Sequence, residues 1–529
     1  MNKSRAWKDP RTSDGDDDNG RFSKDYNDIT NMTWSNILTY QTKIKKKHNL
    51  DLLVGYEINS KESDGLGTTI SNFARWDKPE VNNGVVYQSM GGSNSTTRIV
   101  SYITRANYDY DNKYYLGASW RTDGSSRLAR ENRWGNFWSL SGAWRVSSES
   151  FMKPLQNWLS DLKLRVSYGV NGTLPSSYYG YMGLSSLTSN YNDNPGITQS
   201  QLENKELTWE TNYNFNSGID LGFFDNRLNV TFEYYVRTTK NLLYSRPLSL
   251  ATGFSSYLAN IGKLQNKGYE LEIRSTNIET KDFRWSTSLN LGHNANKILK
   301  LDGDLKQVTS GTSIHKVDLP YSTYYMIEFA GIDPADGEPM FYKNTTDENG
   351  NLNKETTKDP RSAEKVILQC ADPTITGGLG NSISYKWFDL NFNVNFSFGA
   401  WNYDGAAGKL EHGGDGTLNI PIYYRKRWQK EGDETSIERF VVGRSISMTD
   451  YATTRRLYSG DYVRLKNLTF GFTLPKTWTR KVGIDNIRLY ASGNNLLTWA
   501  AYDYIDPESG SSPSWDTPPM RTYTFGLEV

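Results

Sequence analysis

The residues that most often perform catalysis or bind metal ions are few and scattered in this sequence. Its four histidines, His48, His293, His315 and His412, share no HExxH spacing and no pattern of neighbouring carboxylates. No GxxxxGKS, GxxxxGKT or GxGxxG segment follows an apolar strand and opens a helix, so nothing indicates a phosphate-binding loop. The single cysteine, Cys370, cannot form an internal disulfide. The sequence therefore predicts no catalytic residue, no metal centre and no cofactor, and it predicts that the protein is not an enzyme.

Two clusters of carboxylates could bind calcium, because hard cations prefer several oxygen ligands from one tight loop. The first cluster comprises Asp14, Asp16, Asp17 and Asp18, and the second comprises Asp333, Asp336 and Glu338. Neither cluster follows the twelve-residue order of an EF-hand. Solvated turns are the favoured interpretation of both.

Aromatic side chains in two long loops are the residues that could bind a ligand. Rings stack on the faces of sugars, while nearby polar groups bind the hydroxyls. The candidate substrate-binding residues are Trp401, Tyr403, Tyr423, Tyr424 and Trp428, and a second group comprises Trp499, Tyr502, Tyr504 and Trp515. The same rings could instead pack the loops or anchor them at a membrane interface, and this second interpretation is favoured.

The composition limits the class of protein that carries these loops. Only 36% of the 529 residues are hydrophobic, yet 13% are aromatic, and the mean hydropathy is −0.68. A disordered polar chain would lack the rings, and an ordinary soluble core would contain more aliphatic residues. The net charge of +1 favours no nucleic-acid partner. No stretch reaches the roughly 18 apolar residues of a membrane-spanning helix.

Strict alternation of apolar and polar residues recurs along most of the chain. It is clearest in Phe388–Gly399, where Phe388, Leu390 and Phe392 oppose Asp389 and Asn391. Similar alternation occurs in 49–59, 113–123 and 161–171. Five or six apolar groups on one face match the roughly 9–11 residues that cross a bilayer in a tilted strand. The pattern predicts strands with one face toward lipid and the other toward water.

The linkers between these strands alternate in length. We predict about seventeen strands, beginning near residues 30, 49, 98, 113, 134, 161, 208, 227, 266, 283, 321, 338, 375, 387, 461, 487 and 520. Short turns are expected at 45–48, 111–112, 223–226, 276–282, 331–337, 386 and 475–485, with a longer one at 147–160. Long loops are expected at 60–97, 172–206, 241–265, 295–320, 344–371, 400–459 and 498–519. Among the connections that alternate with the short turns, only 124–133 is also expected to be short.

Sorting of short turns and long loops to opposite rims is typical of outer-membrane barrels, with the short turns in the periplasm. The predicted fold is therefore an all-β, antiparallel transmembrane β-barrel. Residues 1–29 are predicted to form an extracellular loop or the start of a fragment, and residues 30–529 the C-terminal part of the barrel.

A series of motifs resembles the SusC/RagA-like TonB-dependent outer-membrane transporters, in the C-terminal portion of their barrel. The matching segments include Arg121–Arg127 (RTDGSSR), Asn132–Gly135 (NRWG), Trp158–Arg165 (WLSDLKLR), Glu206–Thr211 (ELTWET), Asp220–Leu228 (DLGFFDNRL), Asn266–Glu270 (NKGYE), Gly460–Leu468 (GDYVRLKNL) and Arg521–Leu527 (RTYTFGL). Their order and spacing hold from about residue 120 to the end of the chain. The resemblance thus rests on many segments rather than on one motif.

The resemblance implies a barrel of roughly 22 strands, plugged by an N-terminal domain and energised by the TonB complex. It implies a Gram-negative outer-membrane location, contact with outer-membrane lipid, and uptake of oligosaccharides or peptides with a SusD-like lipoprotein. This chain shows no signal peptide, no plug and about five strands too few for closure. We therefore expect a fragment of a longer product, or a split gene whose plug-bearing half is encoded elsewhere.

A different class of protein, a secreted soluble β-sheet adhesin that binds glycans, is the alternative. It would bury its alternating rings in a dry centre, whereas a barrel would expose them to lipid. A barrel also needs detergent for extraction and resists SDS until it is boiled, and a soluble adhesin does neither.

Overall fold

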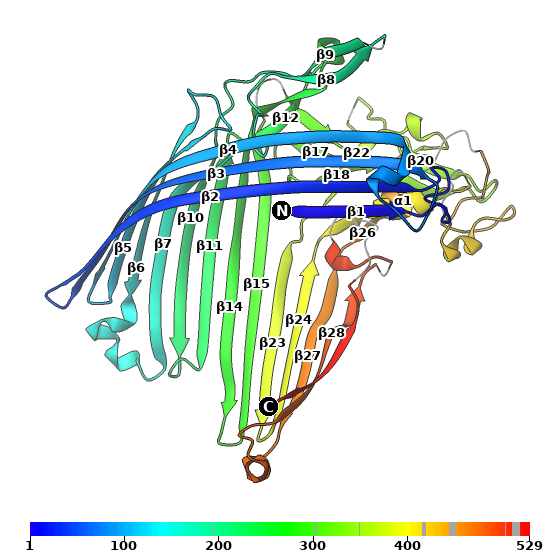
Figure 1. Cartoon of the computed structure of the whole chain (residues 1–529). Helices are drawn as coiled ribbons and strands as arrows, with labels where there is room; N and C mark the ends of the chain where they lie inside the picture. Colours follow the sequence, from blue (N-terminus) through cyan, green and yellow to red (C-terminus); the bar gives the residue numbers. More distant parts are fainter. Residues whose placement is uncertain are drawn as a thin grey trace. The chain divides into compact units, whose positions relative to one another are not determined.

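The computed structural model describes residues 1–192, 194–301, 303, 305–348, 350–414, 419–443, 451–502, 504–509 and 519–529. Nearly all of its regular structure is β-strand (Figure 1). The two described α-helices, α1 (Gly405–Leu410) and α2 (Lys476–Thr479), are short. Short 3-10 helices are η1 (Val81–Asn83), η2 (Val146–Ser148), η3 (Ser150–Leu155), η4 (Leu250–Thr252), η5 (Pro360–Ser362), η6 (Ile422–Lys426), η7 (Thr454–Arg456), η8 (Arg480–Val482) and η9 (Pro507–Ser509). The fold is all-β, as the sequence predicts.

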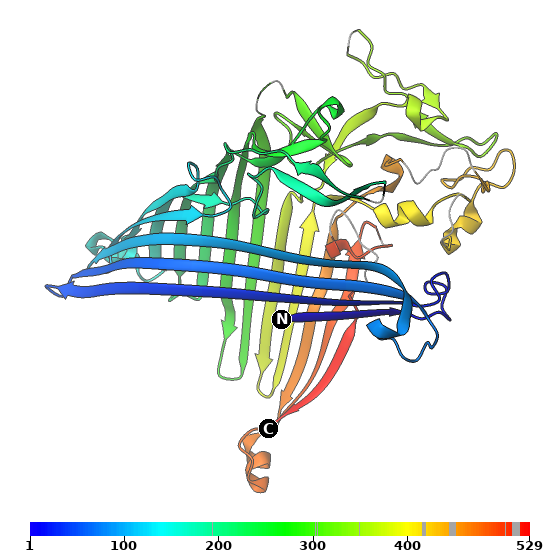
Figure 2. The ribbon, with the colours of Figure 1, turned by 45° about the horizontal axis from the view of Figure 1, so that its top comes forward.

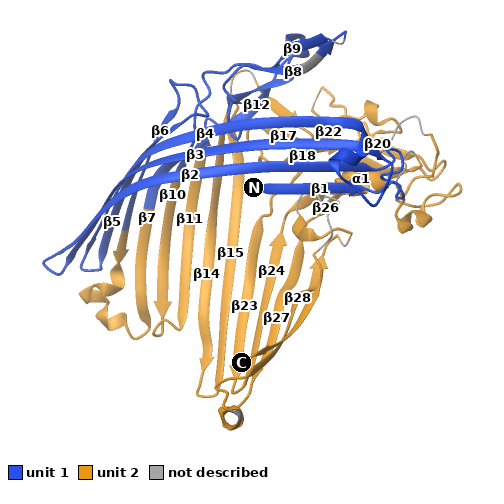
Figure 3. Ribbon diagram, viewed as in Figure 1, with its two compact units in different colours: residues 1–142, 167–213, 239–261 blue, residues 143–166, 214–238, 262–529 orange. Residues whose placement is uncertain are grey.

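The chain divides into two compact units (Figure 3). Unit 1 comprises residues 1–142, 167–213 and 239–261, and unit 2 comprises residues 143–166, 214–238 and 262–529. Four strands contribute residues to both units, namely β6 (Trp134–Arg145), β7 (Leu159–Thr173), β10 (Glu210–Phe223) and β11 (Leu228–Lys240).

Unit 1 is built around long antiparallel strands that follow one another in sequence order. They are β1 (Asn2–Lys8), β2 (Arg21–Ile44), β3 (His48–Phe73), β4 (Gly84–Tyr110), β5 (Tyr114–Ser125) and β6 (Trp134–Arg145). Figure 2 shows β2, β3 and β4 running side by side along their length. Two hairpins, β8 (Leu184–Tyr191) with β9 (Asn194–Gln201) and β12 (Leu243–Pro247) with β13 (Ser256–Asn260), complete the unit. Its buried core comprises Leu128, Phe137, Val170, Leu207 and Trp209.

Unit 2 continues the same antiparallel pattern. Its sheet has the order β10-β11-β14-β15-β23-β24-β27-β28-β29, in which the further strands are β14 (Lys263–Glu279), β15 (Phe283–Lys300), β23 (Ile375–Tyr385), β24 (Phe388–Phe398), β27 (Tyr462–Thr473), β28 (Arg488–Ala500) and β29 (Thr522–Glu528). Small sheets occupy the long connections, and they contain β16 (Gln307–Ser310), β17 (Ser313–Lys316), β18 (Thr323–Ile327), β19 (Phe329–Ile332), β20 (Pro339–Tyr342), β21 (Thr356–Thr357), β22 (Lys365–Cys370), β25 (Trp401–Tyr403) and β26 (Leu457–Ser459).

Tight hairpin turns join neighbouring strands at the predicted short turns. Asp111 and Asn112 have φ values of 56° and 54°, and Lys386 has a φ of 52°. Positive φ at the turn positions matches the twist of the flanking strands, which is why Asn and Asp are common there. The short turns predicted at 45–48, 111–112, 223–226 and 386 are confirmed.

Two predicted features of the strand pattern are wrong. Residues 60–97 are not mainly a loop, because β3 and β4 pair from Ser60↔Arg98 out to Phe73↔Gly84. Backbone hydrogen bonds hold the two strands together here, although the many polar side chains of this segment give no alternation of apolar and polar residues in the sequence. The stretches near 321 and 338 are not sheet-spanning strands, because they fold as β18 and β20 in small sheets. In β18, Tyr324 and Met326 are buried on one side and Ile327 on the other, as in a packed core.

The first 29 residues contain regular structure that the sequence pattern did not indicate. They include β1, which pairs with β2 from Asn2↔Asn27 to Lys8↔Arg21, and the beginning of β2. An extracellular position for this segment stays a prediction. Within the described residues, β1 and β29 each have a strand neighbour on one side only.

The apolar face of the main strands is exposed in both units. Leu38 of β2 is 74% exposed and Phe525 of β29 is 82% exposed. Their opposites in the alternation are polar, and in unit 2 Arg165 donates hydrogen bonds to Asp220 and Glu233 at 2.7–2.9 Å across neighbouring strands. The prediction that the apolar side chains of this face are exposed rather than buried in a dry centre is therefore confirmed for the described strands.

A glycine on β27 allows one ion pair of the polar face to form. Arg488 of β28 reaches Asp389 of β24 at 2.8 Å, although β27 lies between these strands. A Cβ at Gly471 would lie 2.2 Å from Asp389 Oδ1 and 2.7 Å from Arg488 Nη2. A side chain at position 471 would therefore break this contact.

Among the described residues no helix has the length and apolar character needed to cross a bilayer.

Candidate functional site

The long connections of unit 2 pack together on a small core of their own. β25 pairs with β26 through Trp401↔Ser459 and Tyr403↔Leu457. Trp401 and Tyr403 both pack against the cluster formed by Tyr324, Met326 and Leu457. Burial also raises the pKa of the Tyr403 phenol, and the nearby Arg456 opposes this shift. Two of the five predicted substrate-binding residues thus take part in loop packing.

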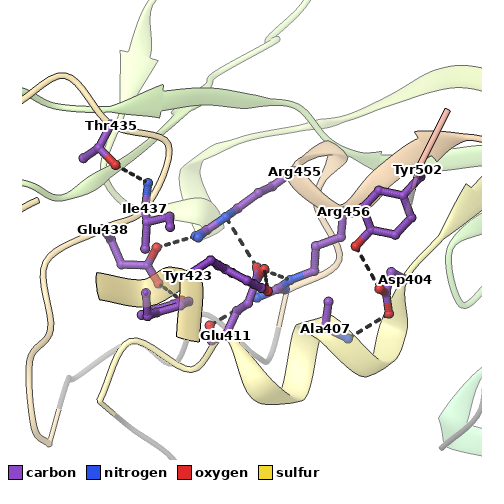
Figure 4. A network of polar contacts seen from close by, with 11 residues as sticks. Asp404, Ala407, Glu411, Tyr423, Thr435, Ile437, Glu438, Arg455, Arg456 and Tyr502 are labelled. Carbon is purple, nitrogen blue, oxygen red and sulfur yellow. Dashed lines mark hydrogen bonds and ion pairs between the residues drawn. The ribbon is translucent and has the colours of Figure 1, made fainter. Parts of the chain in front are cut away.

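Four charged side chains form a buried network beside this core (Figure 4). The Arg455 guanidinium donates a hydrogen bond to Glu438 and lies 3.6 Å from Glu411 Oε2. Arg456 donates from Nε to Glu411 Oε2 at 3.3 Å and from Nη2 to the Glu411 carbonyl at 3.3 Å. Glu438 is 0% exposed and Arg456 is 2% exposed. The network therefore holds together the loop segments that carry Glu411, Glu438 and Arg455–Arg456.

Tyrosines satisfy the remaining oxygens of these carboxylates. Tyr423 donates to Glu411 Oε1 at 2.5 Å, and Tyr424 donates to Glu438 Oε1 at 2.9 Å. The approach to Glu438 depends on Gly413, which has a φ of +62° and whose added Cβ would lie 2.9 Å from Glu438 Oε1. Because each carboxylate is engaged by arginine and tyrosine, the network is built to hold loops together.

A second set of tyrosines lies next to this network. Tyr502 stacks on Tyr458 with ring centroids 3.6 Å apart, and its hydroxyl donates to Asp404 at 3.1 Å. Asp404 also caps α1 by accepting from the Ala407 amide at 2.8 Å. Tyr504 lies 5.3 Å from Tyr502 and is 69% exposed. Tyr502 and Tyr504 come from the second predicted aromatic loop, and Trp515 of that loop lies outside the described residues.

Trp428, the fifth predicted residue, belongs to a different contact. Its indole Nε1 donates to the Pro334 carbonyl at 2.9 Å, and its ring lies over Gly337. The same turn contains the predicted calcium candidates. Lys358 contacts Asp333 at 2.6 Å and Asp336 at 2.7 Å, which supports their interpretation as a turn held by side-chain charges.

The structure therefore brings four of the predicted aromatic residues to one region and separates Trp428 from them. Tyr403, Tyr423 and Tyr424 adjoin the charged residues of the Glu411–Arg456 network, and Trp401 packs against the apolar core beside it. Sequence reasoning missed the network itself. Its two glutamates and two arginines are spread over 45 positions and form no sequence motif, so only the folded structure shows that they meet.

The alkaline titration of Tyr424 is a direct test of this burial. Burial and the neighbouring Glu438 raise the pKa of the Tyr424 phenol above its ordinary value. A raised folded-state pKa contributes stability below the unfolded value, near 10, and this stability is lost as the pH rises through the folded value. We expect the folded parent and its Tyr424→Phe variant to show equal tyrosinate absorbance up to about pH 11.

The unfolded proteins serve as the control for this titration. In guanidinium the parent should exceed the variant by the absorbance of one tyrosinate, with a midpoint near pH 10. Ionisation of Tyr424 near pH 10 in the folded protein would show that the phenol is accessible to water and would contradict the network.

The comparisons with known proteins agree with this architecture. A family model described as TonB dependent receptor-like, beta-barrel matches residues 3–496. TonB-dependent receptor P3 of Formosa agariphila is 33% identical, with the alignment covering 96% of this chain and 53% of that protein. TonB-dependent receptor SusC of Bacteroides thetaiotaomicron is 30% identical, with 82% of this chain and 43% of that protein covered.

A solved structure of the RagAB peptide transporter superimposes with a TM-score of 0.84 at 28% identity, over 96% of this chain and 56% of that chain. This chain spans about half the length of the curated relatives that it matches. The family match along nearly all of its length, together with the antiparallel strands and their exposed apolar face, establishes that the chain belongs to the TonB dependent receptor-like β-barrel family.

Proposed function

We propose that this chain is the barrel portion of a TonB-dependent transporter in the outer membrane of a Gram-negative bacterium, and that the whole protein takes up oligosaccharides or peptides. The observation that carries the proposal is the exposed apolar face of the main strands, paired with a polar face that holds ion pairs such as Arg165–Asp220. Lipid solvates the first face and a water-filled interior solvates the second. The relatives are named as receptors and transporters, which supports uptake rather than catalysis.

The proposed partners follow from the same family. A SusD-like lipoprotein would cover the extracellular loops, and the TonB complex would supply energy through a plug domain. The strands β2, β3 and β4 have 24, 26 and 27 residues, whereas a tilted strand crosses a bilayer with about 9–11 residues. Their surplus length would extend beyond the membrane and enlarge the surface available to a lid protein.

Substrate contact would occur through the loop aromatics of unit 2. Of the five candidates Trp401, Tyr403, Tyr423, Tyr424 and Trp428, the half-buried Tyr423 lies beside the exposed Tyr504, with ring centroids 5.4 Å apart. Tyr424 is 4% exposed and its hydroxyl is bound to Glu438, so it would act by supporting the loop. Rings of this kind offer stacking surfaces to sugars and to peptide side chains.

Deletion and complementation test this function. Loss of the gene for the complete transporter should abolish growth on its substrate class, and the plasmid-borne gene should restore growth. Separate cultures on defined oligosaccharides and on defined peptides as carbon source distinguish the two substrate classes. Unchanged growth on every substrate tested would remove the support for uptake.

Extraction separates this function from the alternative of a secreted soluble adhesin. A barrel should appear in the outer-membrane fraction, require detergent for release, and migrate faster on SDS gels before boiling than after it. Recovery of the protein from the culture medium without detergent would favour the adhesin.

A further inference from the structure

One pocket in the loops of unit 2 is lined by two arginines for which the described residues provide no acidic partner. Its volume is about 450 Å³, and it is lined by Ile420, Pro421, Ile422, Tyr424, Arg425, Arg427 and Phe440. This volume lies within the range of ordinary small-ligand sites. None of the four charged residues of the Glu411–Arg456 network lines the pocket, and Tyr424 connects the two because its hydroxyl donates to Glu438.

The two guanidinium groups differ from the other described arginines of the loops 344–371 and 400–459. Arg361, Arg439, Arg455 and Arg456 each pair with a carboxylate. Among the described residues, neither Arg425 nor Arg427 has an ion pair or a side-chain hydrogen bond. Glu438, the acid bound to Tyr424, is already engaged by Arg455. The pocket therefore combines two unneutralised positive charges with no lining carboxylate.

The two arginines favour an anionic ligand, and the remaining lining residues indicate which kind of group that anion carries. Ile420, Pro421, Ile422 and Phe440 are apolar, and Ile422 and Phe440 are exposed. Such a lining buries an aliphatic or aromatic group well. It offers few hydrogen-bond partners to sugar hydroxyls, which would lose their water without compensation. A ligand in which a carboxylate is joined directly to an apolar group fits this pocket, because the arginines can bind the carboxylate and the apolar residues can pack against the rest.

We propose that this pocket binds the C-terminal carboxylate of a peptide whose last side chain is apolar. Arginine binds carboxylates through paired N–H donors, and such charge-assisted hydrogen bonds are stronger than neutral ones. The apolar side chain would pack against Ile422 and Phe440. The proposal rests on the proposed function, in which the protein captures substrates at its extracellular loops, and it narrows the substrate class to peptides.

Binding to the complete detergent-purified transporter tests the proposal without requiring transport. The probes are the fluorescein-labelled peptide Ala-Ala-Ala-Leu with a free C-terminus, its C-terminal amide, and Ala-Ala-Ala-Ser with a free C-terminus. Fluorescence anisotropy should give tightest binding to the first probe. The double variant Arg425→Gln/Arg427→Gln should weaken that binding at least about tenfold and should abolish the preference for the free carboxylate.

The matched control is Lys426→Gln, which removes a charge between the two arginines but does not line the pocket. It should leave the affinity within about twofold. Equal binding of the acid and the amide, an equal loss in Lys426→Gln, or no binding of any peptide would overturn the proposal. Binding of digalacturonate that displaces the peptide and depends on both arginines would overturn it in favour of acidic sugars.

The binding assay can contradict the proposed pocket without contradicting the proposed function, and the growth experiment can do the reverse. A transporter that restores growth but shows no carboxylate preference contradicts the pocket alone. A detergent-purified protein that binds the peptide through both arginines, from a strain in which deletion leaves growth unchanged, contradicts uptake alone. Unboiled gel mobility of each variant verifies that the barrel is folded.

Discussion

Replacing Glu438 with leucine is expected to destabilise the loops of residues 401–460 by about 3 kcal/mol, which corresponds to roughly a hundredfold increase in local opening. Removing one partner of a buried ion pair leaves the other charge without water and without compensation. Arg455 would retain only Glu411, at 3.6 Å, and the Tyr424 hydroxyl would lose its acceptor. Limited proteolysis of the complete transporter in detergent, with cleavage sites assigned by mass spectrometry, measures this opening.

The exposed pair Lys343–Glu355 provides the control for that measurement. Its nitrogen and oxygen lie 2.9 Å apart, but both side chains are exposed. Solvent screens such pairs, so Glu355→Gln should leave the cleavage rate unchanged. A Glu438→Leu protein that resists proteolysis as well as the parent would show that the loops do not depend on the buried network.

An arginine in place of Val394 is expected to destabilise the barrel by about 2–4 kcal/mol and to reduce its assembly in the outer membrane. Val394 lies near the centre of β24, on the face that carries Phe392 and Phe396. In the proposed transporter that face would meet the hydrocarbon of the bilayer, where a guanidinium loses its hydration. Unfolding by urea in lipid vesicles, followed through the heat-dependent gel mobility, gives the change in free energy.

The neighbouring position on the other face is the matched control. Asn393 precedes Val394 on the same strand and belongs to the polar set with Asp389 and Asn391. Asn393→Arg adds the same charge at the same depth, but on the face turned away from lipid, so we expect little loss of stability. Equal destabilisation by both substitutions would mean that β24 does not separate lipid from water.

Strand register follows from local pattern wherever apolar and polar residues alternate. β24 spans Phe388–Phe398, as the alternation predicts, because a shift of one residue would turn every phenylalanine to the wrong face. The Asp111-Asn112 turn is predictable for a similar local reason, since Asn and Asp are among the few residue types that tolerate positive φ.

The pattern fails where strands leave the membrane or pack into small sheets. β3 continues from residue 60 to Phe73 through Ser, Gly and Thr, because hydrogen bonds to β4 hold it in place without an apolar face. β18 looks like a spanning strand in the sequence, yet Met326 is fully buried among the loops. In both cases pairing with another strand, β4 for β3 and β22 for β18, decides the structure.

The sequence by itself determined the class of fold, the alternation of the two strand faces and the likeness to a family, because each depends on neighbouring residues or on motifs in order. Only the tertiary structure decided which loop residues meet. It placed Glu411, Glu438, Arg455 and Arg456 in one buried network, and it placed Arg425 and Arg427 around a pocket without an acidic partner among the described residues. Charges separated by tens of residues attract one another only after the strands have fixed the ends of their loops, so no local pattern records the pairing.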